Sequence, residues 1–247
     1  MLSWSGRDVT RGSYGARTDD HGAAGTGAMV RPVARVAAMS VRHVLFDADG
    51  VLQHVPAGWW AAVETYLGDR TRDFVRETWS EELPMLVGQG DFLPVLAAGF
   101  RRYGVAEPAE NVYRAVWCDA LEVVEESFAL VRALRSRGYG VHLGTNQESR
   151  RVEFMRSTLG YDDEFDSSWY SCELGLAKPD PRFFAEAARG MGADPSSVLF
   201  VDDTERNVDG ARTAGMVGVH WDVSRGHDEL VRLLGEHGVD AAGLRAV

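Results

Sequence analysis

Two pairs of aspartates in this sequence have the residue types and spacing of a reactive site. Asp47 and Asp49 follow the apolar run 44–46 and are two residues apart, so at the end of an extended strand their side chains project to the same side. Two carboxylates this close do not both ionise easily, and one of them is pushed toward its acid form. Such a pair suits a nucleophile that works beside a general acid/base.

The second pair, Asp202 and Asp203, ends the apolar run 198–201. Carboxylate oxygens are the hard ligands that Mg²⁺ prefers, so both residues are candidate metal ligands. Between the two pairs lie Thr145, which supplies a hydroxyl donor, and Lys178, the one lysine in a chain with 25 arginines. A compact ammonium fits a crowded site beside a metal better than the fork of a guanidinium, so we expect Lys178 to belong to the site.

These residues lie at the ends of apolar segments that alternate with helical ones from residue 41 onward. The pattern predicts strands over 44–46, 140–145, 198–201 and 217–220, and helices near 128–134, 152–159, 181–188 and 205–214. This alternation predicts an α/β fold with a Rossmann-like parallel sheet covered by helices on both faces. Ligands of such sheets bind at the carboxyl ends of the strands, where the polar clusters are expected to meet.

Residues 57–121 interrupt the alternation. Aromatic and aliphatic side chains recur there at helical spacing without a strand pattern, which predicts an inserted all-helical cap. The core then comprises residues 41–56 and 122–247. Residues 1–40 hold five arginines, six glycines and no sustained periodicity, so we expect a disordered tail or a start set too far upstream, with Met29 or Met39 as the true first residue.

Composition narrows the class of protein. Of the 247 residues 45% are hydrophobic, which is enough for a sizeable core, and the apolar runs are too short for a transmembrane helix. The net charge of −11 argues against a nucleic-acid partner, because phosphate backbones attract basic surfaces. The chain has two cysteines, which favours a reducing, cytoplasmic location without membrane association. Monomer and homodimer both remain open.

The motifs together resemble those of the haloacid dehalogenase superfamily. In order along the chain they are Asp-x-Asp-Gly-Val-Leu (47–52), Gly-Thr-Asn (144–146), Lys-Pro-Asp (178–180), Val-Asp-Asp (201–203) and Asn-Val-x-Gly-Ala-x-x-Ala-Gly-Met (207–216). The resemblance extends from residue 42 to about residue 221. The helical insert after the first motif is similar to the small cap of one branch of that superfamily.

The resemblance implies Mg²⁺-dependent hydrolysis of small phosphorylated metabolites, which are phosphate monoesters, through an aspartyl-phosphate intermediate. By position in the motifs, Asp47 would attack phosphorus, and Asp49 would protonate the leaving oxygen and then accept a proton from water. The implied phosphate-binding residues are Thr145, Asn146 and Lys178. The implied metal ligands are Asp47, the backbone carbonyl of Asp49, and Asp203, with Asp202 close by.

Two departures from the family pattern bear on function. Val51 stands where the family usually has threonine, and Asp49 argues against carbon–halogen cleavage because the dehalogenases lack this second aspartate. A phosphomutase and a non-catalytic binding or regulatory module remain alternatives to the phosphatase. With Asp49 protonated the site has no surplus positive charge, so we expect one further cation from the cap, from among Arg70, Arg72, Arg76, Arg101, Arg102 and Arg114. The pair Arg150 and Arg151 is expected on a solvated helix face.

Overall fold

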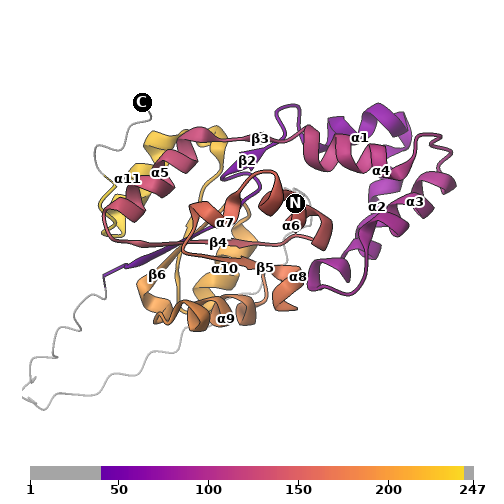
Figure 1. Ribbon diagram of the computed structural model, residues 1–247. Helices are drawn as coiled ribbons and strands as arrows, with labels where there is room; N and C mark the ends of the chain where they lie inside the picture. Colours follow the sequence, from indigo (N-terminus) through magenta and orange to yellow (C-terminus); the bar gives the residue numbers. More distant parts are fainter. Residues whose placement is uncertain (1–39, 242–247) are drawn as a thin grey trace, which may run out of the picture.

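A five-stranded parallel sheet forms the centre of the computed structural model, which describes residues 40–241 (Figure 1). The strand order is β5-β4-β1-β6-β7, and every neighbouring pair is parallel. The strands are β1 (His43–Phe46), β4 (Gly140–Thr145), β5 (Ser167–Tyr170), β6 (Val198–Asp202) and β7 (Val217–His220). This sheet confirms the predicted α/β class, and it sets the carboxyl ends of β1, β4 and β6 side by side.

Helices cover both faces of the sheet, as Figure 1 shows. Alternate side chains of β1 face opposite layers: Val44 is buried in one apolar cluster with Val131, whereas Leu45 is buried in another with Phe184. A strand covered on both faces is apolar throughout, which accounts for the run 44–46. The helices are α5 (Glu125–Ser136), α6 (Ser149–Ser157), α7 (Tyr161–Glu164), α8 (Ser171–Leu174), α9 (Pro181–Met191), α10 (Glu205–Thr213) and α11 (His227–Glu236), with the short turns η4 (Pro195–Ser197) and η5 (Val223–Arg225).

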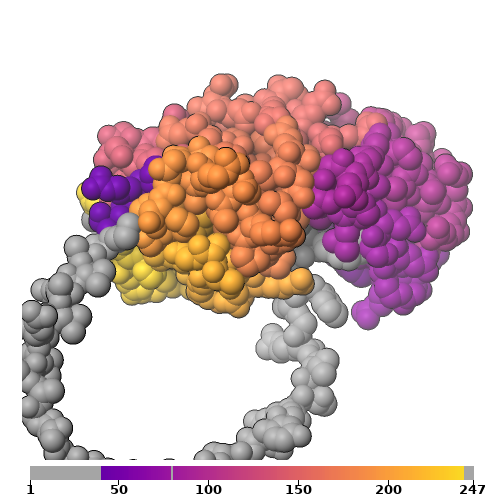
Figure 2. Space-filling model, turned by 90° about the horizontal axis from the view of Figure 1, so that it is seen from below, coloured from indigo at the N-terminus to yellow at the C-terminus, as the bar shows by residue number. Residues whose placement is uncertain are grey.

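A helical lobe is inserted between β2 (Gln53–His54) and β3 (Glu122–Val123), which pair with each other in antiparallel fashion. The lobe has its own apolar cluster, centred on buried residues such as Leu67, Phe74 and Leu96, and Figure 2 shows it in purple at one end of the molecule. Its elements are α1 (Trp59–Leu67), η1 (Gly68–Arg70), α2 (Thr71–Glu82), η2 (Met85–Val87), α3 (Phe92–Arg102), α4 (Ala109–Tyr113) and η3 (Arg114–Asp119).

The sequence pattern missed strand β5 and helix α11 of the core, together with the short helices α7 and α8 and the ribbon of β2 and β3. Strand β5 contains two serines, and Tyr170 is its one fully buried residue, because this edge strand pairs only with β4. Helix α11 follows the last motif and was not expected. The tail expected over residues 1–40 lies, apart from Ser40, outside the described residues. Within residues 40–241, no helix combines the length and apolarity needed to cross a lipid bilayer.

Two stacked histidines join β1 to β4. His43 Nδ1 lies 3.1 Å from His142 Nε2, and His142 Nδ1 lies 2.8 Å from the Ser167 hydroxyl. Burial lowers the pKa of both rings, that of His142 to about 4. Both rings are therefore neutral at pH 7.

We expect these rings to make the protein less stable as the pH falls from 7 to 5. An unfolded histidine titrates near pH 6.5, so in this range the unfolded chain takes up protons that the folded chain does not, and stability is lost. In urea unfolding, His142→Gln should reduce the dependence of the midpoint on pH. His237→Gln, at an exposed position, should keep the wild-type dependence. Equal dependence in all three proteins would assign the effect to other groups.

Candidate active site

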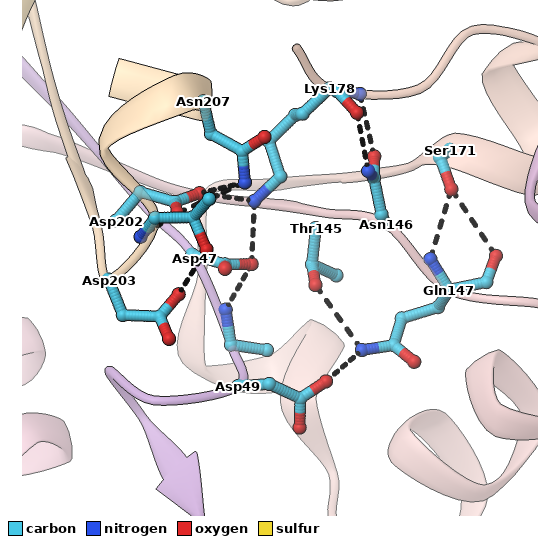
Figure 3. A network of polar contacts seen from close by, with 12 residues as sticks. Asp47, Asp49, Thr145, Asn146, Gln147, Ser171, Lys178, Asp202, Asp203 and Asn207 are labelled. Atoms are coloured by element: carbon cyan, nitrogen blue, oxygen red, sulfur yellow. Dashed lines mark hydrogen bonds and ion pairs between the residues drawn. The ribbon is translucent and has the colours of Figure 1, made fainter. Parts of the chain in front are cut away.

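The carboxyl ends of the central strands bring the expected side chains together (Figure 3). Asp47 follows β1, Thr145 ends β4 and Asp202 ends β6. Lys178 comes from the loop before α9, and its Nζ lies 2.7 Å from Oδ1 of Asp47 and 2.7 Å from Oδ2 of Asp202. One buried ammonium thus bridges carboxylates that belong to two neighbouring strands.

The balance of charge at this site is negative. Burial opposes the charge of Lys178, but Asp202 and Asp47 outweigh that effect, and the pKa of the ammonium lies above its ordinary value. Burial and the nearby Asp202 raise the pKa of Asp47 to about 7, while burial and Asp47 raise the pKa of Asp203 to about 6. Three carboxylates therefore lie near one ammonium group, and a further cation would reduce the repulsion between them.

The donor atoms of this cluster fit a small, hard cation. Oxygens of Asp47, Asp202 and Asp203 lie within 4.8 Å of one another. Mg²⁺ prefers such oxygens and uses few of them, since it keeps several of its waters. Within the described part of the chain, the one side-chain donor to Asp203 is the Thr204 hydroxyl, 3.1 Å from Oδ1. Asp47 and Asp203 are thus the carboxylates best able to hold Mg²⁺.

Asp202 has a different environment from Asp203. Its Oδ1 accepts the Thr204 backbone N–H at 2.8 Å, and both of its oxygens lie 3.1 Å from Nδ2 of Asn207. Together with Lys178, these donors occupy the carboxylate, so in this structure Asp202 orients the lysine. Asn207 opens the last sequence motif but was not predicted as a site residue; its place in the first turn of the helix after Asp202 is the signal that could have found it.

Asn146 also holds Lys178 in place, through its backbone. Its Oδ1 accepts the Lys178 backbone N–H at 2.7 Å, and its Nδ2 donates to the Lys178 carbonyl at 2.8 Å. The side chain expected to bind phosphate is therefore committed to the lysine loop (Figure 3). The hydroxyl of the neighbouring Thr145 accepts a weaker bond, at 3.3 Å, from the Gln147 amide.

The contacts of Asp49 favour its ionised form, whereas the charge balance in the sequence analysis assumed that Asp49 is protonated. Its carboxylate accepts from Gln147 Nε2 at 2.7 Å, Gln53 Nε2 at 2.8 Å and Arg151 Nη2 at 3.0 Å. Burial would raise the pKa of Asp49, but Arg151 and the two amides are among the groups that keep it below its ordinary value. The carboxyl groups of this site whose pKa is raised are those of Asp47 and Asp203.

The prediction for Arg151 is wrong. Its side chain is 7% exposed and paired with Asp49, and its guanidinium also donates to the backbone carbonyl of Trp117 in the lobe. The six lobe arginines proposed as the additional cation, Arg70, Arg72, Arg76, Arg101, Arg102 and Arg114, are all exposed. The buried cation comes instead from the first turn of α6, which follows β4 and so begins at the same edge of the sheet as Asp49.

Gly50 allows the loop after β1 to approach Asp203. It has a φ of 80°, and a Cβ at this position would lie 2.6 Å from Oδ2 of Asp203. A side chain would therefore strain the backbone and displace the carboxylate. This close approach explains the glycine that follows Asp49 in the first motif.

Comparison with known proteins identifies the family to which this chain belongs. Residues 41–215 match the model of the haloacid dehalogenase-like hydrolases, so the chain is a member of that family, as its motifs indicated. It is 42% identical over 220 residues to Phosphatase MT3486 of Mycobacterium tuberculosis, covering 83% of this chain and 100% of that protein. It is 28% identical over 191 residues to a protein of Dickeya dadantii named "Probable phosphatase IndB", covering 73% and 81% of the two chains.

Other similarities are more limited. Alignments with bifunctional epoxide hydrolase 2 of Mus musculus and Sus scrofa cover 73% of this chain but 36% of those proteins, so the chain spans about a third of their length. A haloacid dehalogenase family enzyme of Bacteroides thetaiotaomicron, crystallised with magnesium and inorganic phosphate, has a TM-score of 0.65 at 18% identity, covering 77% of this chain and 99% of that one. At this identity the likeness shows a shared fold.

We expect Gly50→Ala to weaken Mg²⁺ binding, because the added Cβ displaces Asp203. Gly192→Ala is a matched control, since Gly192 also has a positive φ, 67° with a ψ of 25°, but has no described atom within 4 Å of an added Cβ. Both variants should lose roughly 1–2 kcal/mol of stability from the left-handed backbone. Only Gly50→Ala should bind Mg²⁺ at least about tenfold more weakly in calorimetric titrations of metal-free protein. Equal affinities in the two variants would argue against Asp203 as a ligand.

Proposed function

We propose that this protein is a Mg²⁺-dependent hydrolase of small-molecule phosphate monoesters and that the reaction passes through an aspartyl-phosphate on Asp47. The observation that carries the proposal is the position of Asp47, a buried carboxylate that contacts Lys178 and lies within ligand-sharing distance of Asp203. The 42% identity to a protein named as a phosphatase over that protein's whole length supports the same reaction class.

The contacts of Asp47 indicate which of its oxygens reacts. Oδ1 already accepts from the Lys178 ammonium and from the Ala48 backbone N–H, each at 2.7 Å. We therefore assign the attack on phosphorus to Oδ2. Lys178 would then lie beside the phosphoryl oxygens and offset their charge, with the Thr145 hydroxyl as a further donor.

Asp49 would move the protons in both steps. In the first step the new bond from Asp47 to phosphorus forms as the ester P–O bond breaks, and the leaving oxygen takes the proton of Asp49. In the second step water attacks phosphorus, its proton passes to Asp49, and inorganic phosphate leaves Asp47 regenerated. Asp49 must gain a proton before the first step, and a phosphate dianion placed beside its carboxylate favours that uptake.

The described residues also provide a place for the cation. Mg²⁺ would be held by the carboxylates of Asp47 and Asp203 and by the backbone carbonyl of Asp49. When bound, it would neutralise the crowded carboxylates and polarise the phosphoryl group. Asp202 and Asn146 would keep Lys178 in position, and the helical lobe over residues 57–121 would act as the cap above the strand ends.

The first test is the nucleophile. Purified protein should hydrolyse p-nitrophenyl phosphate with Mg²⁺, and EDTA should suppress the reaction. Asp47→Asn should abolish turnover while keeping the circular dichroism spectrum, because the amide has nearly the volume of the carboxyl group. Asp209→Asn, an exposed position on α10, is the control and should keep wild-type turnover. Turnover by Asp47→Asn, or full activity in EDTA, would contradict the proposal.

The second test separates the two steps. With p-nitrophenyl phosphate the leaving group departs without help from an acid, so Asp49→Asn should still form the aspartyl-phosphate. Hydrolysis of this intermediate should be slow because the variant has no base for the water. We expect a burst of nitrophenolate close to one equivalent per enzyme, followed by slow release. A single phase at the wild-type rate would contradict the role of Asp49.

A further inference from the structure

Arg151 is a second buried cation beside the proposed reaction centre, and no step above uses it. Its side chain is 7% exposed, and Nη2 lies 3.0 Å from Oδ1 of Asp49. The other end of its guanidinium donates to the Trp117 carbonyl of η3 in the lobe. The guanidinium therefore lies between the proton-transferring carboxylate and the underside of the lobe.

The hydrogen bonding of Arg151 is incomplete. A guanidinium has five N–H donors, and the buried Nε of Arg151 has no hydrogen-bond partner among residues 40–241. Leaving such a donor buried without an acceptor is costly, and the cost is larger for a charged group. The nearby Glu148 does not meet this need, because its carboxylate accepts the backbone N–H groups of Arg150 and Arg151 and the Tyr113 hydroxyl. Because Nε is buried, the donors left for an acceptor from outside the chain are the second N–H groups of Nη1 and Nη2, each of which has one acceptor among the described residues.

The position of Arg151 identifies the part of a substrate that it would meet. If Asp49 protonates the leaving oxygen, that oxygen lies within hydrogen-bond distance of Asp49 and therefore close to Arg151. Atoms two or three bonds beyond the ester oxygen are then within reach of the guanidinium. In the proposed reaction the transferred phosphoryl group would be bound to Asp47, beside Lys178. Arg151 therefore faces the leaving group.

We propose that Arg151 recognises a carboxylate on the leaving group and that the substrates are phosphate esters of small hydroxy acids. A planar guanidinium matches the two oxygens of a carboxylate, and one such anion supplies acceptors for the unused donors. A second phosphate dianion would bring more charge than one arginine offsets beside Asp49 and Glu148. This assignment rests on the proposed phosphatase activity and adds to it the class of substrate.

The test compares two esters that differ in one group: the phosphate esters of glycolic acid and of ethylene glycol. The wild-type protein should prefer the carboxylate ester by about 10–100-fold in kcat/KM. Arg151→Gln should reduce this preference to within about threefold, and Arg151→Lys should keep part of it because it keeps the charge. Glycolate should inhibit hydrolysis of p-nitrophenyl phosphate competitively in the wild type and much more weakly in Arg151→Gln.

Arg150→Gln is the matched control. Arg150 also joins α6 to the lobe, through Asp91 at 2.6 and 2.7 Å, but its side chain is 36% exposed and its carboxylate partner is not Asp49. This variant should keep the wild-type preference. The substrate assignment is overturned if the wild type treats the two esters alike, or if Arg151→Gln slows both by the same factor, since the arginine would then act only by positioning Asp49 or the lobe. A wild-type protein that hydrolyses neither ester nor p-nitrophenyl phosphate would overturn the phosphatase itself.

Discussion

The bridge from Lys178 to Asp47 and Asp202 is the interaction on which the site depends. In the register of β1 and β6, Phe46 lies beside Val201, so the residues that follow them, Asp47 and Asp202, are aspartates on adjacent strands. Two buried carboxylates this close would repel each other and disfavour the very register that creates the sheet edge. The lysine removes that conflict, and Asn146 and Asn207 fix the lysine and its partner. The contact of Lys178 with the two aspartates therefore both stabilises the pairing of the strands and forms the candidate site.

Asp49 connects the two parts of the molecule. Its carboxylate is bound by Gln147, by Arg151 and by Gln53. Gln53 opens the ribbon that leads to the lobe, and Arg151 contacts the lobe through the Trp117 carbonyl. The environment of the proposed proton donor is thus set jointly by the sheet and by the lobe, whereas that of Asp47 is set by the strand ends and by Lys178 from the loop before α9.

Much of this arrangement could be predicted from residue order. The apolar runs before Asp47 and Asp202 locate the strands, and parallel strands place their carboxyl ends together, so the meeting of these two aspartates follows. Lys178 was expected beside them because of its residue type. What could not be predicted is which group each side chain contacts. Asn146 and Gln147 are neighbours at one strand end, yet one binds the lysine backbone and the other binds Asp49. Arg151 has the sequence context of a surface residue, yet its guanidinium is buried between Asp49 and the Trp117 carbonyl of the lobe. Strand β5 was missed because its two serines interrupt the apolar pattern of a buried strand, and an edge strand tolerates such residues.

The two-stranded ribbon of β2 and β3 has a consequence for how this architecture can change over evolution. The chain leaves for the lobe and returns from it at adjacent positions, with Val124 N–H bonded to the Leu52 carbonyl at 2.8 Å. Because the exit and re-entry points are already joined, lengthening or replacing the lobe requires no new closure within the sheet. Natural variation can therefore change the lobe while the residues at the strand ends are inherited unchanged.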